Sequence, residues 1–152
     1  MAKPAAAEPD ALSLGALGGV LGYHLAQAAV FTYGLFERHV GEPFQLRKTE
    51  YSMLMLLLAN GPLSPKRLAQ ALALSAPNLT MLLDRLQDRG LLKRERSQTD
   101  RRSQNIVLTE QGLKVATEGA AAAGPMERDL AQRLSSAERA MLIELLGKVA
   151  GL

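Results

Sequence analysis

The sequence predicts a mainly α-helical fold that carries one small β-hairpin. Hydrophobic residues make up 47% of the 152 residues, but aromatic residues make up only 4%, and Trp is absent. Leu, Ala and Met must therefore fill the core, which favours helices over sheets. Only the runs 91–96 and 105–108 have the pattern of strands, and a stretch rich in arginine joins them. A chain of this length can form a single domain with its own core.

The N-terminal part of the chain predicts an arm followed by one long helix. Residues 1–11 are rich in Ala and Pro and indicate a flexible arm. From Leu14 to about His39, apolar residues recur at spacings of three and four, as in a helix with a heptad seam. The seam consists of Leu14, Leu17, Leu21, His24, Ala28, Phe31 and Leu35. It either packs inside one core or forms a subunit interface, and the small size of the chain favours the interface.

Helix breakers and capping residues place the next three helices. The segment 41–44 (GEPF) is expected to break the first helix. A second helix is expected to begin with Thr49 as its N-cap and to end at Asn60. Ser64 and Ser75 are expected to cap two short helices, the second of which ends at Gly90 in the left-handed conformation.

Two helices are predicted after the hairpin. Thr109 is expected to start the first of them. Ser135 and Glu138 have the spacing of a capping box, in which each side chain bonds the other's backbone N–H, so they predict the start of the last helix.

Positive charge is concentrated in one stretch of the chain. The net charge is +3 and the isoelectric point about 9.4, but residues 85–102 alone contain seven Lys and Arg against three Asp and Glu. A local excess of this kind indicates a polyanionic partner. The absence of Cys excludes disulfides and thiolate metal sites and suits a reducing cytoplasm.

Residues 11–36 contain no Asp, Glu, Lys or Arg, and the stretch is long enough to span a bilayer. However, Ser13, His24, Gln27 and Thr32 interrupt it, and weakly apolar Ala and Gly make up much of the rest. No basic cluster precedes it, as a signal peptide would require. We therefore expect a cytoplasmic protein without membrane contact.

The two short helices and the hairpin have the outline of a winged helix-turn-helix. The second short helix has one apolar face, formed by Leu79, Leu82, Leu83 and Leu86. Its first turn exposes small and hydrogen-bonding side chains that can approach base edges in a major groove. Its free N–H groups favour phosphate. The residues expected to contact DNA from these helices are Ser64, Lys66, Ser75, Ala76, Pro77, Asn78, Thr80, Met81 and Arg85. The alternative is a solvated face on a structural helix.

The hairpin concentrates arginine near its tip. Arg94, Arg96, Arg101 and Arg102 can follow the phosphate backbone and enter a narrow minor groove, where the negative potential is strongest. Asp100 is interpreted as a partner that orients a guanidinium through a bidentate pair. The alternative is an ordinary charged turn that serves solubility.

The stretch 82–112 resembles the signature of the MarR family of transcriptional regulators. The matching residues are Asp84-Arg85-Leu86, Gly90-Leu91-Leu92, Asp100-x-Arg102, Leu108-Thr109 and Gly112. The resemblance implies a homodimer whose recognition helices enter successive major grooves of a pseudo-palindromic operator. It assigns Arg102 to the minor groove and Asp100 to the orientation of Arg102, and it suggests that Arg85 braces the wing or the DNA backbone.

The resemblance also implies a division of the chain by function. Residues 12–48 and 109–152 are expected to form a helical dimerisation region, and residues 49–108 the winged helix-turn-helix DNA-binding domain. The expected dimer interface contains Leu14, Leu17, Leu21, Leu130, Leu134, Leu142, Leu145 and Leu146. The chain departs from the family pattern in its first helix, which carries no charge before Glu37.

The family resemblance further implies a small-molecule effector. Members are often released from DNA by aromatic or phenolic acids that bind between the dimer helices and the DNA-binding domain. A concave apolar surface with a few polar or cationic groups suits such a carboxylate. The expected lining residues are Tyr23, His24, Phe31, His39, Phe44, Arg47, Tyr51 and Met55. Taken singly, these residues fit core packing better, above all His24 on the seam and Met55.

The sequence argues against an enzyme, and no cofactor is expected. It has two His, no Cys, no glycine-rich phosphate loop after a strand, and no carboxylate pair suited to acid–base chemistry. A metalloregulator that uses His24, Glu37 and His39 is a minor alternative. The stronger alternative is an architectural or protein-binding winged-helix module without an effector. Only a regulator predicts tight binding to one palindromic DNA sequence.

Overall fold

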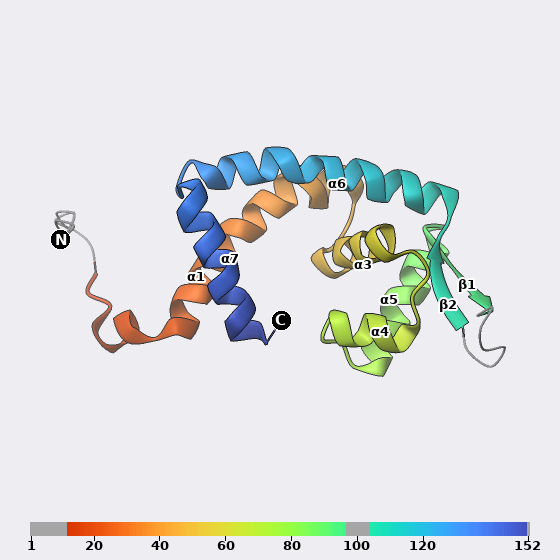
Figure 1. Ribbon diagram of the computed structural model, residues 1–152, viewed down its shortest axis with the longest axis horizontal. Coiled ribbons are helices and arrows are strands. Elements are labelled where there is room, and N and C mark those ends of the chain that lie inside the picture. Colours follow the sequence, from red (N-terminus) through yellow and green to blue (C-terminus); the bar gives the residue numbers. More distant parts are fainter. Residues whose placement is uncertain (1–11, 97–103, 152) are drawn as a thin grey trace. The chain divides into compact units, whose positions relative to one another are not determined.

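The computed structural model describes residues 12–96 and 104–151, and it confirms a mainly helical fold with a two-stranded antiparallel sheet (Figure 1). Contacts divide the chain into two units, Met1–Gly34 and Leu35–Leu152. The division by function into residues 12–48, 49–108 and 109–152 stays a prediction, and the predicted arm 1–11 lies outside the described residues. No helix within the described ranges has the length and apolar character needed to cross a bilayer.

The first helix is shorter than the heptad seam predicts. A 3₁₀ helix, η1 (Gly15–Gly19), precedes α1 (Leu21–Phe36), and extended Val20 separates the two. Glycine weakens a regular helix, and Gly15 has a φ of 51°, which few other residues adopt. The prediction of a helix from Leu14 is therefore wrong, and the helix begins at Leu21. The seam residue His24 instead has its Nε2 at 2.9 Å from the Gly18 carbonyl oxygen.

The segment 41–44, predicted to break the first helix, continues the helical path instead. A π-helical turn, η2 (Glu37–Gly41), and the short α2 (Glu42–Phe44) follow α1 directly. Pro43 lies in α2, and the fixed φ of proline, about −65°, is itself helical. The chain turns one residue later, at Gln45, which has a φ of 52°.

The predicted N-cap of the next helix, Thr49, is also wrong. Helix α3 (Lys48–Asn60) begins after Arg47, because Glu50 Oε2 accepts a hydrogen bond from the Arg47 N–H at 2.8 Å. A carboxylate in the third helical position thus satisfies the backbone of the residue that precedes the helix. The predicted end at Asn60 is confirmed, and Gly61 follows with a φ of 70°.

The two short helices are confirmed at their predicted starts. Helix α4 (Pro65–Ala71) follows Ser64, whose hydroxyl accepts from the Arg67 N–H. Helix α5 (Ala76–Asp88) follows Ser75, but the Ser75 side chain makes no capping hydrogen bond, so only the position of this cap is confirmed. Gly90 closes α5 with a φ of 70°. The predicted apolar face of α5 is buried in a core shared with α3 and the wing: Leu79, Leu82, Leu83 and Leu86 are at most 4% exposed.

The wing is an antiparallel hairpin that leads directly into the next helix. Strands β1 (Leu92–Arg96) and β2 (Gln104–Leu108) pair from Leu92 with Leu108 to Arg96 with Gln104. Leu63, before α4, exchanges two backbone hydrogen bonds with Ile106 of β2. In Figure 1, β2 continues into α6 (Glu110–Ala131), which lies along α3.

The last helix, α7 (Ser136–Ala150), begins with the predicted capping box. Glu138 accepts from the Ser135 N–H at 2.8 Å, and Ser135 Oγ accepts from the Glu138 N–H at 3.3 Å. These bonds to Ser135 hold the pKa of the Glu138 carboxyl below its ordinary value, so the cap is fully charged at neutral pH. None of the α7 residues is buried within the single chain.

A tight junction joins the end of α5, the base of the wing and the start of α6. Thr109 donates from its N–H to the Leu91 carbonyl at 3.1 Å and from its hydroxyl to the Gly90 carbonyl at 2.5 Å. Its hydroxyl also accepts from the Gly112 N–H at 3.0 Å. A Cβ on Gly112 would lie 1.9 Å from the Leu91 oxygen, so only glycine fits there.

Replacing Gly112 with Ala is expected to destabilise the protein by at least about 3 kcal/mol, because the methyl group would collide with backbone rather than with an adjustable side chain. Urea unfolding followed by circular dichroism measures the change. Gly147→Ala in α7 is the control: its Cβ would meet nothing within 4 Å, and it should be neutral or stabilise by up to about 1 kcal/mol. Equal stabilities of the two variants would contradict the junction.

Candidate nucleic-acid interface

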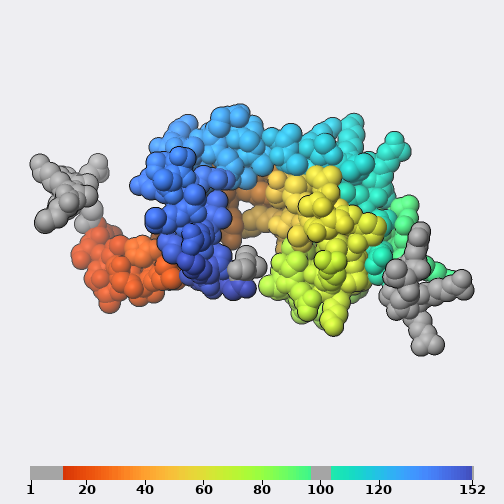
Figure 2. All heavy atoms as spheres, in the orientation of Figure 1, coloured from red at the N-terminus to blue at the C-terminus, as the bar shows by residue number. Residues whose placement is uncertain are grey.

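The first turns of α5 present a continuous exposed surface. Ser75, Ala76, Pro77, Asn78 and Thr80 are exposed, and Met81 is 67% exposed although it is a large apolar residue. The opposite face holds the four buried leucines, so the helix cannot rotate this surface inward without exposing its core. In Figures 1 and 2, α4 and α5 lie on the side of α3 away from α6.

The predicted contacts from α4 differ in exposure. Lys66 is exposed in the first turn of α4, whereas Ser64 is half-buried, and its hydroxyl serves as the cap of that helix. Thr80 donates its hydroxyl proton to the Ala76 carbonyl at 3.0 Å, so the hydroxyl oxygen is left to accept. Within this set, Lys66, Ser75 and Asn78 are exposed polar residues whose side chains make no capping or backbone hydrogen bond in the described structure.

An ion pair connects the wing to α5. Arg94 Nη2 of β1 donates to Asp84 Oδ1 at 2.5 Å, and both side chains are partly exposed. An exposed pair of this kind contributes about 0.2–1 kcal/mol to folding. Its larger effect is orientation, because it fixes the direction of a strand that otherwise projects from the core. Arg96 is exposed at the end of β1, and the predicted residues Asp100, Arg101 and Arg102 lie outside the described ranges.

Arg85, predicted to contact DNA or to brace the wing, lies beside a buried carboxylate. Its Nε is 3.0 Å from Oε1 of Glu50, which is only 3% exposed. The Nε–H is not aligned for a hydrogen bond with that oxygen, so the contact is electrostatic. The other Glu50 oxygen is 3.7 Å from Nη1 of Arg89. Sequence reasoning missed this cluster.

Two signals could have revealed these contacts. Arg85 and Arg89 are four residues apart on α5, so they share a helix face and repel one another unless an acidic group lies between them. Glu50 lies in the first turn of α3, and a long apolar run follows it in the same helix. An acidic residue so close to a buried run is a candidate partner for these arginines. For the contact between α5 and the wing, the signal is Asp84, the acidic residue of the Asp-Arg-Leu signature, which precedes a hairpin rich in arginine.

The residues predicted to line an effector pocket are distributed over both units. Tyr23, His24 and Phe31 belong to the first unit and the other five to the second. Phe44, Tyr51 and Met55 are half-buried against the main core, and Arg47 is exposed.

Tyr51 and His39 already have polar partners. The Tyr51 ring packs edge-on against Phe36, and its hydroxyl donates weakly to the Gly119 carbonyl at 3.4 Å. Burial raises the pKa of the Tyr51 phenol, so it remains a neutral donor at neutral pH. His39 Nε2 lies 2.8 Å from Asp129 Oδ2, a contact that joins η2 to α6.

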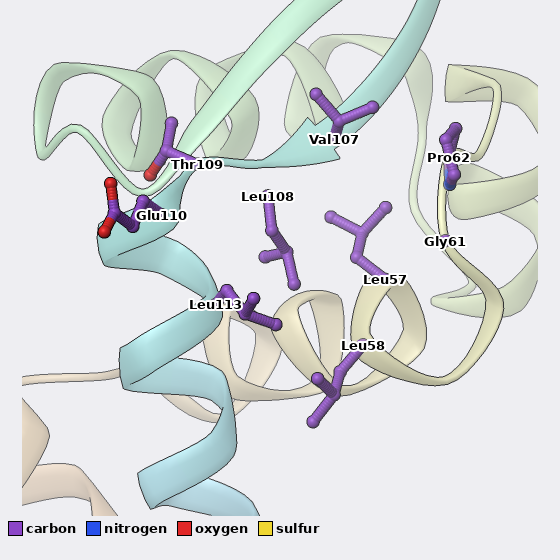
Figure 3. A pocket seen from close by; sticks show the side chains of 9 residues that line it. All are labelled: Leu57, Leu58, Gly61, Pro62, Val107, Leu108, Thr109, Glu110 and Leu113. Carbon is purple, nitrogen blue, oxygen red and sulfur yellow. The ribbon is translucent and has the colours of Figure 1, made fainter.

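A hollow of about 420 Å³ lies elsewhere, between α3, β2 and the start of α6 (Figure 3). Leu57, Leu58, Leu108 and Leu113 point toward it in the close-up, and Glu110 lies at its edge. None of the eight residues predicted to bind an effector lines it.

The predicted dimer residues are incompletely covered within one chain. Leu14, Leu17 and Leu21 are 43–58% exposed, and Leu142, Leu145 and Leu146 are 39–50% exposed. Leu130 and Leu134 are half-buried.

The chain is similar to known transcriptional regulators. A model of the MarR family matches residues 44–103. A putative transcriptional regulatory protein for the hcr operon of Thauera aromatica is 30% identical over 147 residues, which is 97% of this chain and 89% of that protein.

Solved structures extend the similarity to the fold. The transcriptional repressor CouR, bound to a 23-mer DNA duplex, is 33% identical and has a TM-score of 0.84, over 92% of this chain and 99% of the CouR chain. CouR bound to p-coumaroyl-CoA is 30% identical with a TM-score of 0.81, over 92% and 98% of the two chains. The winged helix-turn-helix architecture is thus common to these proteins and to this chain.

The ion pair between Asp84 and Arg94 provides a test of the wing's orientation. Asp84→Asn should lower affinity for specific DNA several-fold, because Arg94 loses the group that directs it, while the melting temperature should fall by less than roughly 4 °C. Fluorescence anisotropy and thermal unfolding measure the two effects.

Asp88→Asn is the matched control for charge, since Asp88 is exposed one turn further along α5. It makes the same change in charge and should leave binding equal or slightly stronger. If Asp84→Asn strengthened binding as much as Asp88→Asn, the pair would have no orienting role.

Proposed function

The chain belongs to the MarR family of DNA-binding transcriptional regulators, and on this premise we propose that it is a repressor that a small aromatic or phenolic acid releases from its operator. It binds a pseudo-palindromic operator as a homodimer. The observation that carries the DNA-binding assignment is the exposed first part of α5, which includes Asn78 and Met81 above a buried leucine face.

The operator contacts follow from the chemistry of the exposed side chains. Asn78 can form a bidentate pair with adenine in the major groove, and Ala76, Pro77 and Met81 can contact thymine methyl groups. Ser64, Lys66, Ser75 and Thr80 supply backbone or base contacts, and Arg85 has the bracing role that the resemblance implies for it. Arg94, Arg96, Arg101 and Arg102 supply the wing contacts, with Asp100 as the orienting partner of Arg102. The CouR complex with a DNA duplex supports this placement by analogy of fold.

A homodimer supplies the second half of the recognition surface. The exposed leucines at 14, 17 and 21 and those at 142, 145 and 146 are the apolar surface that a second copy would cover, together with Leu130 and Leu134. Two copies related by a two-fold axis place two recognition helices about one turn of DNA apart.

The effector proposal rests on chemistry and on one relative. Phe44, Tyr51 and Met55 offer aromatic and apolar surface, and Arg47 offers a cation for a carboxylate. Tyr23, His24, Phe31 and His39 complete the proposed lining. The CouR complex with p-coumaroyl-CoA supports a phenolic acyl group as the class of ligand.

Genomic selection with the purified protein should recover one pseudo-palindromic site with half-sites about one helical turn apart. Asn78→Ala should weaken binding to that site about tenfold or more through loss of a base contact, and Arg102→Ala should weaken it strongly without loss of the dimer. Anisotropy titrations and sedimentation measure these effects, and affinity should fall steeply with salt.

Gln87→Ala is the control, since Gln87 is exposed in the last turn of α5, and it should bind normally. Recovery of DNA without a common sequence would favour the architectural alternative. Normal binding by Arg102→Ala would contradict the wing assignment.

A hydroxybenzoate or cinnamate bound to the folded protein should raise its melting temperature. The expected rise is roughly 5–10 °C at a concentration about 100-fold above Kd, and the same compound should release the operator. Cyclohexanecarboxylate, which has the charge but no aromatic ring, is the control ligand.

Two variants locate the site. Arg47→Gln should reduce the thermal shift, because the carboxylate loses its cation. Leu113→Arg places a charge in the separate hollow of Figure 3 and should leave the shift unchanged. No shift with any aromatic acid would overturn the effector proposal, and a shift lost only in Leu113→Arg would overturn the proposed site.

A further inference from the structure

We propose that Glu50 is a positioning residue for DNA recognition, which holds α5 in the orientation that the operator requires through Arg85 and Arg89. The inference rests on the proposed role of α5 as the helix that enters the major groove. It adds to that function a residue outside both the recognition helix and the wing.

Glu50 is almost completely buried and uses both carboxylate oxygens. Oε2 accepts from the Arg47 N–H at 2.8 Å and lies 3.7 Å from Arg89 Nη1, while Oε1 lies 3.0 Å from Arg85 Nε. The side chain is 3% exposed, whereas those of Arg85 and Arg89 are 41% and 35% exposed. One buried anion on α3 therefore faces two cations, Arg85 in α5 and Arg89 directly after its last residue.

Arg89 extends the cluster to a third segment. Its Nη1 donates to the Gln45 carbonyl at 2.8 Å, and its Nη2 donates to the Phe44 carbonyl at 3.2 Å. These carbonyls belong to the turn between α2 and α3, where Gln45 has the left-handed φ of 52°. The last turn of α5 is thereby bonded to backbone as well as to Glu50, and its position depends on where that turn lies.

Apolar packing alone does not determine the orientation of α5 so closely. Its leucine face packs against α3 and the wing, and such contacts depend on buried area and not on direction. The hydrogen bonds from Arg89 to the Gln45 and Phe44 carbonyls are directional. Buried charged groups such as Glu50 can also select one arrangement among several of similar packing. Arg85 lies seven residues after Asn78, two turns along the same helix. A displacement of the helix at Arg85 therefore also displaces Asn78 in the first turn.

The arginines also require the carboxylate. Arg85 and Arg89 are four residues apart on α5, a spacing at which like charges destabilise a helix. The buried Arg85 Nε has no hydrogen-bond partner among the described atoms, so its charge is balanced by the nearby Glu50. Removal of the negative charge leaves two cations facing a neutral group, and α5 can lower this repulsion by turning away from α3.

The test is Glu50→Gln, whose amide oxygen can still accept from the Arg47 N–H. The variant should fold and dimerise, and it should bind the operator recovered by genomic selection about tenfold more weakly. Its binding to an unrelated duplex of equal length should be unchanged or stronger, because the protein gains one unit of positive charge. The ratio of specific to non-specific affinity is the readout that a purely structural role would not change.

Glu118→Gln provides the matched control, since Glu118 is exposed on α6 and the change in charge is the same. It should keep the ratio of the wild-type protein. If Glu50→Gln keeps the ratio too, the proposal is overturned. If Asn78→Ala also binds the operator normally, the recognition role of α5 fails first, so the two failures can be distinguished.

A double-mutant cycle separates positioning from direct contact by Arg85. If Arg85 acts through Glu50, the variant with both Glu50→Gln and Arg85→Gln should bind no more weakly than the weaker single variant. If Arg85 instead contacts phosphate, the losses should add and the salt dependence of binding should fall by about one charge. The additive outcome overturns the proposal for Arg85.

Arg89→Gln keeps the proposal testable if Glu50→Gln does not fold. Arg89 is partly exposed, and its loss removes the two hydrogen bonds to the Phe44 and Gln45 carbonyls. The buried carboxylate of Glu50 keeps Arg85 as its charged partner. The same loss in the ratio of specific to non-specific affinity is expected. A folded Arg89→Gln protein with the wild-type ratio would overturn the role of this branch.

Discussion

The carbonyl group of Leu91 lies so close to the first turn of α6 that no side chain fits at Gly112. The same oxygen accepts the Thr109 N–H, and the Thr109 hydroxyl bonds the carbonyl of Gly90. Because β1 begins at Leu92 and β2 ends at Leu108, these contacts fix the base of the wing. Helix α5 ends just before Gly90, so α5, the wing and α6 all depend on one short stretch of backbone.

Those parts of the fold that local chemistry determines could be predicted from the sequence. The leucine spacing of α5, the caps at Ser64 and Ser135 and the left-handed Gly90 each depend on residues within one or two turns, and all are confirmed. The errors lie where distant or competing interactions decide. The glycine-rich start of the seam is not α-helical, so α1 begins only after Val20. The side chain of Glu50 places the N-cap of α3 at Arg47, two residues before the predicted cap at Thr49.

The exposed part of the candidate site could be predicted, and its internal connections could not. Solvent exposure at Asn78 or Met81 follows from helical periodicity, because the opposite face is apolar. The contacts of Arg94 with Asp84 and of Arg85 with Glu50 join different elements, and helical periodicity contains no information on which charges meet across them. Charged residues are ordinarily assigned to the surface, so a carboxylate that is 3% exposed escapes that reasoning.

Three elements restrain α5, and all of them act on its second half or just beyond it. Glu50 of α3 faces Arg85 and Arg89, Arg94 of β1 holds Asp84, and Thr109 bonds the Gly90 carbonyl. The first turn, which would meet the bases, lies about 18 Å from the last, since each residue adds about 1.5 Å. A rotation of about 5° at the restrained end would therefore move the first turn by about 1.6 Å, more than the range over which a hydrogen bond to a base edge survives. On the proposed role of α5, small changes at the α2–α3 turn or at the wing are thus sufficient to alter DNA recognition without any change in the residues proposed to contact DNA.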